Sequence, residues 1–144
     1  MAHYVTSIKT SLSVEEAFDY MSDLRNFQEW DPGVSSSEKA DGDEVGKDSE
    51  FDVVANGTEL TYVLVEFDRP NRAVAEANTN RLRSYDIIEV SSSDTGSIVT
   101  YDATLELKGV FKLFSPVMSL LFDRIGSQAD DGLQRVLPDA VKVS

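Results

Sequence analysis

The dipeptide Asn56-Gly57 constrains the fold of this chain most, because it is the strongest short-range signal for a two-residue β-hairpin. Such a turn pairs Ala55 with Thr58 and Val53 with Leu60, and directly paired residues share one face of a sheet. This register gathers apolar side chains on a single face, namely Phe51, Val53, Leu60, Tyr62 and Leu64. The other face is mainly polar, so the pattern predicts a hairpin with one buried and one solvated face.

Strand signals continue on both sides of this hairpin. Residues 3–10 predict a first strand, and turns divide the later chain into strands near 72–78, 81–90 and 97–107. Within the last of these, every second residue from Val99 to Leu107 is apolar, which predicts a half-buried strand with Tyr101 facing inward.

Helix signals flank the strands. Ser13 and Glu16 have the spacing of a capping box, and a second short helical piece runs from Leu24 to about Gln28. Near the other end, Ser115-Pro116 is typical of an N-cap residue followed by proline at the first helical position. Apolar residues then keep helical spacing up to Pro138. Strands segregated from helices predict an α+β domain.

Length and charge exclude several classes of protein. The 144 residues fit one domain over 1–144, and the net charge of −13 argues against nucleic acid and against a polybasic membrane anchor. The chain has no cysteine and one histidine, His3, so we expect no metal site and no cofactor. Without an export signal or a long apolar run, we expect a cytoplasmic protein with no stable membrane insertion.

Three stretches of sequence carry a resemblance to a known family. They are Ser13-Val14-Glu15-Glu16-Ala17-Phe18 with the later Trp30 and Pro32-Gly33-Val34, then Val65-Glu66-Phe67-Asp68-Arg69-Pro70-Asn71-Arg72, then Leu107-Lys108-Gly109. Together they resemble the START-like (SRPBCC) superfamily, in its polyketide cyclase/dehydrase and lipid-transport branch, over essentially the whole chain. The resemblance implies a helix-grip fold, in which a curved antiparallel β-sheet wraps around a long C-terminal α-helix, with two short helices after the first strand.

The resemblance also implies an apolar cavity between the sheet and the C-terminal helix. The candidate ligand-binding residues are Trp30, Phe51, Tyr62, Leu64, Tyr101, Leu105, Phe114, Met118 and Phe122. Trp30 either closes the end of the core or contacts the ligand, and the two tyrosines either pack in the core or mark a polar point in the cavity. We expect a protein that binds a hydrophobic or amphipathic small molecule, such as a lipid or polyketide. The alternative is a polyketide aromatase/cyclase or dehydratase that acts in the same cavity.

The inward face of the strand over 81–90 stays ambiguous, because Ile87 and Ile88 are adjacent. We favour the face that carries Tyr85, which leaves Asp86 as an ordinary solvated carboxylate. On the opposite face, Asp86 becomes a candidate for a raised pKa and for proton transfer. Arg81 and Arg83 are candidates for pairing with an anionic head group, although rim positions in solvent are the commoner place for such residues.

The segment from Val110 to Ile125 holds ten apolar residues in sixteen positions, more than one core-facing stripe requires. The simpler interpretation is a buried helix with a few exposed apolar residues. The alternative is that Phe111, Phe114 and Met118 line a ligand entrance or a partner surface, which would allow a protein partner or self-association through 110–122.

Overall fold

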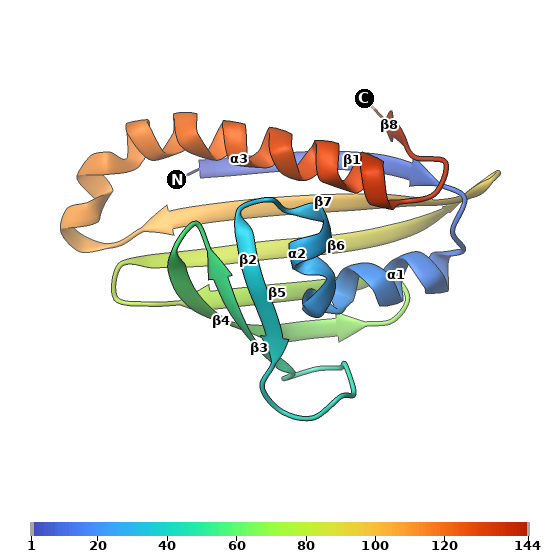
Figure 1. Ribbon diagram of the computed structural model, residues 1–144, viewed down its shortest axis with the longest axis horizontal. Coiled ribbons are helices and arrows are strands. Elements are labelled where there is room, and N and C mark those ends of the chain that lie inside the picture. Colours follow the sequence, from blue (N-terminus) through green and yellow to red (C-terminus); the bar gives the residue numbers. More distant parts are fainter. Residues whose placement is uncertain (1, 144) are drawn as a thin grey trace.

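The computed structural model describes residues 2–143, apart from the side chains of Phe114, Ser115, Met118 and Ser119. The described residues form one eight-stranded antiparallel sheet in the order β2-β3-β4-β5-β6-β7-β1-β8 (Figure 1). The strands are β1 (Ala2–Thr10), β2 (Val34–Lys39), β3 (Glu50–Ala55), β4 (Thr58–Asp68), β5 (Arg72–Asn78), β6 (Leu82–Ser93), β7 (Gly96–Leu107) and β8 (Val141–Val143). The strands predicted above are therefore confirmed, and the structure adds β2 and β8 to them.

The hairpin between β3 and β4 has the predicted register. Ala55 pairs with Thr58, Val53 with Leu60 and Phe51 with Tyr62. Asn56 and Gly57 both have positive φ, 50° and 79°, as a type I′ turn requires. All five residues of the predicted apolar face are buried, so the sequence pattern located this part of the core correctly.

The helices are α1 (Val14–Ser22), η1 (Leu24–Asn26), α2 (Phe27–Trp30), η2 (Gly109–Phe114) and the long α3 (Ser115–Val136). Helices α1 and α2 cover the middle of the sheet, and α3 lies along β1 on the same face, in contact with α2 (Figure 1). Both hydrogen bonds of the predicted capping box are present, at 3.1 and 3.2 Å between Ser13 and Glu16. With a curved sheet against a long C-terminal helix, the predicted helix-grip fold is confirmed.

Two glycines allow α3 to approach its neighbours closely. A Cβ atom on Gly132 would lie 1.7 Å from the carbonyl oxygen of Trp30, and one on Gly126 would lie 2.3 Å from the ring of Tyr4. At Gly132 only glycine fits, because the atoms in the way are backbone atoms, and a Cβ atom at position 126 would require the Tyr4 ring to shift. These two contacts place the second half of α3 against α2 and β1.

A buried carboxylate ties α3 to the edge of the sheet. Thr6 of β1 donates a hydrogen bond of 2.6 Å to Asp130 of α3, and Lys142 of β8 pairs with the same carboxylate at 3.0 Å. The short strand β8 pairs with β1 through Val141, Lys142 and Val143. It escaped prediction because three residues are too few to show a period.

The expectation of a buried helix is wrong for the segment that leads into α3 and for its first half. Val110, Leu113 and Leu120 are 72%, 83% and 76% exposed, and Val117 and Leu121 are also exposed. A helix buries its apolar residues only where another layer lies beneath it, and the contacts with β1 and α2 come from the second half. No helix among the described residues is long and apolar enough to cross a membrane.

Candidate functional site

A cavity of about 420 Å³ lies between the sheet and α3. This volume falls within the range of small-molecule sites. The apolar side chains that line it come from α2, β2, β4, β6, β7 and α3, and they include Phe27, Val34, Leu60, Leu82, Leu105, Leu121, Phe122 and Ile125. The cavity can therefore remove an apolar molecule from water.

Polar side chains from three strands of the sheet, β4, β6 and β7, meet on the sheet side of this cavity. The hydroxyl groups of Tyr62 on β4 and Ser84 on β6 share a hydrogen bond of 2.8 Å. The Tyr101 hydroxyl on β7 donates to Oδ2 of Asp86 on β6, at 3.0 Å. All four side chains line the cavity and all are buried.

A second carboxyl group reaches the cavity from the turn between α2 and β2. Oδ1 of Asp31 accepts a hydrogen bond of 2.9 Å from the backbone N–H of Gly33, which closes the turn after α2. The carbonyl of Gly33 in turn accepts a bond of 2.7 Å from the backbone N–H of Asn56. The tip of the hairpin is thus tied to the turn that holds Asp31.

The favoured interpretation of the 81–90 strand is wrong. Asp86 is 4% exposed and faces the cavity, whereas Tyr85 is only half-buried on the outer side, where its ring lies under the Arg83 guanidinium. In the observed register Ile88 pairs with Tyr101, and Asp86 pairs with Ala103. The inward series is therefore Leu82, Ser84, Asp86, Ile88 and Val90. The sequence pattern did not reveal this series, because alternation is recognised from apolar residues and Ser84 and Asp86 are polar.

Burial controls the ionisation of these groups. The low-polarity surroundings raise the pKa of Asp86 from 3.8 to about 7, although the hydrogen bond from Tyr101 opposes this shift. Burial also raises the pKa of Asp31, and it raises the pKa values of Tyr62 and Tyr101 well above 10.0. Asp86 thus holds a proton near neutral pH more readily than a surface carboxylate does.

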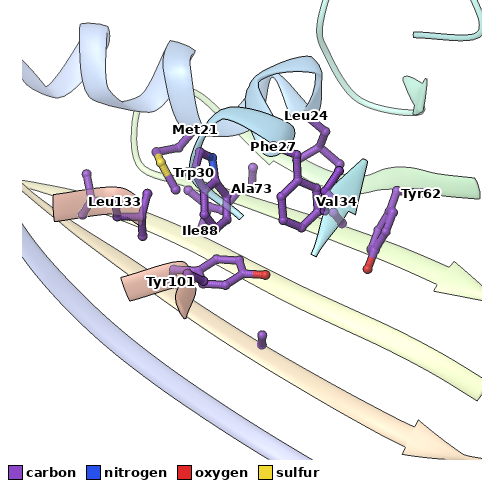
Figure 2. Close-up of a cluster of buried hydrophobic side chains, with 14 of the residues drawn as sticks. Met21, Leu24, Phe27, Trp30, Val34, Tyr62, Ala73, Ile88, Tyr101 and Leu133 are labelled. Carbon is purple, nitrogen blue, oxygen red and sulfur yellow. The ribbon is translucent and has the colours of Figure 1, made fainter. Parts of the chain in front are cut away.

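The cavity has an open end and a closed end along β6. Leu82 and Leu105 are half-buried, while Asp86 lies four residues further along β6, about 13 Å at the usual rise of a strand. Beyond it lies the packed core, where the Trp30 ring is 5.0 Å from that of Tyr101 and 4.9 Å from that of Phe27. Figure 2 shows the hydroxyl groups of Tyr62 and Tyr101 pointing toward the same space. The polar groups therefore gather at the closed end.

The predicted site residues fall into three groups. Tyr62, Tyr101, Leu105 and Phe122 line the cavity. Trp30, Phe51 and Leu64 are buried in the core and are not among the lining residues. The side chains of Phe114 and Met118 lie outside the described residues. For all nine candidate residues, a role in ligand binding stays a prediction.

Several lining residues were not predicted. Asp31, Ser84 and Tyr4 face the cavity from three separate elements. Ser84 is one of the polar residues that hid the inward series of β6, and Asp31 follows a short helix where no period applies. Of the two arginines that were considered, Arg83 pairs with Glu76 at 2.8 Å, and Arg81 lies over the ring of Phe111 at 5.7 Å.

An antiparallel sheet that grips a C-terminal helix, with a cavity between them, defines the helix-grip class. A family model described as polyketide cyclase / dehydrase and lipid transport matches residues 1–137, so the chain belongs to this family. The polar groups at the closed end are consistent with either half of that description, since binding and acid–base chemistry both use them. None of the curated proteins searched matches the chain.

Solved structures with the same fold have little sequence in common with this chain. XoxI from Bacillus cereus is 20% identical, with a TM-score of 0.68 over 96% of this chain and 97% of that one. A START superfamily protein from Mycobacterium smegmatis is 12% identical, with a TM-score of 0.56 over 91% of this chain and 99% of that one. A hypothetical protein from Helicobacter pylori is 13% identical, with a TM-score of 0.71 over 91% and 84%. These likenesses show the fold alone.

Proposed function

We propose that this protein binds a hydrophobic or amphipathic small molecule, such as a lipid or a polyketide, in the cavity between the sheet and α3. The observation that carries the proposal is the cavity itself, about 420 Å³ in volume and lined largely by apolar side chains. Such a cavity favours binding because it takes apolar surface out of water, at about 25 cal/mol for each Å². The few polar groups at the closed end would orient the ligand.

The test compares two substitutions of the same size on one strand. Ala103→Phe fills the cavity, because Ala103 lines it from β7, while Thr104→Phe adds the same bulk on the outer side of that strand. We expect native mass spectrometry to show a small molecule that travels with the purified protein and with Thr104→Phe, and that is lost from Ala103→Phe. A neutral fluorescent apolar probe that binds none of the three proteins would contradict the proposal.

One observation favours catalysis as a second candidate function. Asp86 and Tyr101 form a hydrogen-bonded acid–base pair inside the cavity, and the pKa of Asp86 is raised to about 7. A general acid or base works best when its pKa lies near the operating pH. An aromatase/cyclase or dehydratase could use the pair to move a proton on a folded polyketide chain.

The catalytic candidate is tested in an assay with a model polyketide substrate. We expect Asp86→Asn and Tyr101→Phe to lower turnover at least about a hundredfold, because general acid–base catalysis contributes that much or more. Tyr85→Phe, on the outer side of β6, is the control and should leave turnover unchanged. Equal rates in all variants would remove this candidate and leave binding alone. A cytoplasmic location stays a prediction in both cases.

A further inference from the structure

The two ends of the cavity differ in charge. The closed end carries two carboxyl groups and three hydroxyl groups, from Asp31, Tyr62, Ser84, Asp86 and Tyr101, and all five side chains are buried. Among the described lining residues, the basic side chain is Arg124, which lies on the exposed part of α3. A ligand that reaches the closed end therefore meets oxygen atoms and no cation.

The hydrogen bonds already present leave this end rich in acceptors. The Tyr101 hydrogen is donated to Oδ2 of Asp86, and Tyr62 and Ser84 share one hydrogen bond between them. Asp31 uses Oδ1 to accept from the backbone of Gly33. The second oxygen of each carboxyl group stays as an acceptor. A ligand group that donates a hydrogen bond therefore complements these oxygens. A hydroxyl group does so, and it can in addition accept a hydrogen bond from a tyrosine.

Charged groups fit this end poorly. A carboxylate or phosphate would lie beside Asp31 and Asp86 in surroundings of low polarity, where repulsion between like charges is strong. An ammonium group would be attracted, but it would lose its hydration among apolar walls. A neutral group avoids both costs, and the raised pKa of Asp86 shows how strongly this place resists charge.

We infer that the ligand is an uncharged amphiphile that carries a hydroxyl group at one end, and that this end lies beside Asp86 and Tyr101. The apolar part of the ligand lies against Leu82, Leu105 and Phe122, which line the same cavity. This inference rests on the proposed function, because it describes the molecule that the proposed cavity holds.

The experiment measures how well four probes with the same carbon chain displace a neutral fluorescent reporter, N-phenylnaphthylamine, from the native protein. The probes are decanol, decanoate, decylamine and decane, compared at mildly alkaline pH. We expect decanol to bind about tenfold more tightly than decanoate or more, since one unfavourable charge interaction accounts for such a factor. Decanol should also bind more tightly than decylamine and decane.

Two carboxyl groups on opposite faces of the sheet supply a matched pair of variants. In Asp86→Asn we expect the preference for decanol over decanoate to fall severalfold, because one negative charge leaves the closed end. Asp102→Asn removes a carboxylate on the outer side of β7, where Asp102 pairs with His3, and should keep the preference of the native protein.

Each outcome decides something. Decanoate, decylamine or decane binding as tightly as decanol to the native protein would overturn the inference and leave the proposed function standing. An unchanged preference in Asp86→Asn, with the reporter still bound, would also overturn it. If the reporter and all four probes fail to bind, the proposed function falls, and this inference falls with it. The ranking in the native protein decides the question even if a variant does not fold.

Discussion

The Tyr101 hydroxyl donates a hydrogen bond of 3.0 Å to Asp86 from the neighbouring strand. In the register of β6 and β7, Tyr101 pairs with Ile88, so the bond runs diagonally to the residue two positions earlier on β6. It joins a neutral donor to a carboxyl group in surroundings that disfavour charge. The ionisation of Asp86 is consequently coupled to the stability of the fold.

We expect the native protein to lose stability as the pH rises from about 4 to about 7, because of Asp86. The pKa of this residue is about 7 in the folded chain against 3.8 for an ordinary aspartate, so the folded state holds a proton that the unfolded state has released. The free energy of unfolding should fall by a few kcal/mol across this interval and level off above it.

Urea unfolding at a series of pH values checks this prediction. Asp31, whose pKa is also raised by burial, contributes with the same sign, so the informative quantity is the difference between the native protein and Asp86→Asn. That difference should depend on pH between about 4 and about 7. A constant difference across the interval would show that Asp86 titrates normally.

Thr6→Val should lower the free energy of unfolding by about 2 kcal/mol, since it removes a donor from a buried carboxylate. Thr6 and Asp130 are both buried, and their hydrogen bond of 2.6 Å joins β1 to α3. The matched control is Thr61→Val, which removes the bond of 3.1 Å to the exposed Asp52 and should change stability by less than about 0.5 kcal/mol. Equal effects in chemical denaturation would refute the anchoring role of Asp130.

Gly132→Ala should destabilise the fold by about 3 kcal/mol, because the new methyl group would overlap the backbone carbonyl of Trp30. To relieve that overlap, α3 would have to move away from α2. In Gly46→Ala the added carbon meets no atom within 4 Å, so thermal unfolding should be close to that of the native protein. A Gly132→Ala protein as stable as this control would contradict the close approach of the two helices.

The exposed apolar residues of η2 and of the start of α3 should matter for association and not for stability. Replacing Leu113 and Leu120, which are 83% and 76% exposed, by serine should change the free energy of unfolding by less than about 0.5 kcal/mol. If the segment mediates self-association, light scattering at increasing concentration should show a smaller average mass for the double variant. A large loss of stability would mean that these leucines pack against the core.

Local rules located much of the fold in advance. The type I′ turn at Asn56-Gly57 determined the register of β3 and β4, and the capping box at Ser13 located the start of α1. Both signals depend on residues close together in the sequence, so no other part of the chain can overrule them easily. The same holds for the alternation in β7, where the position of Tyr101 on the inner face followed from a period of two.

Local rules could not predict which side chains meet at the closed end of the cavity. Asp86 and Ser84 lie on the inner face of β6 although they are polar. Their burial becomes favourable through the pairing of β6 with β7 and through the hydrogen bonds of Asp86 with Tyr101 and of Ser84 with Tyr62. Likewise, the apolar residues of α3 are densest in its first half, yet it is the second half that has β1 and α2 beneath it. The sequence by itself determined the hairpin and the strands, because these follow from short-range geometry and periodicity, and its family resemblance implied the helix-grip architecture. The tertiary structure decided which polar groups meet inside, since partners from separate strands must compensate one another's desolvation.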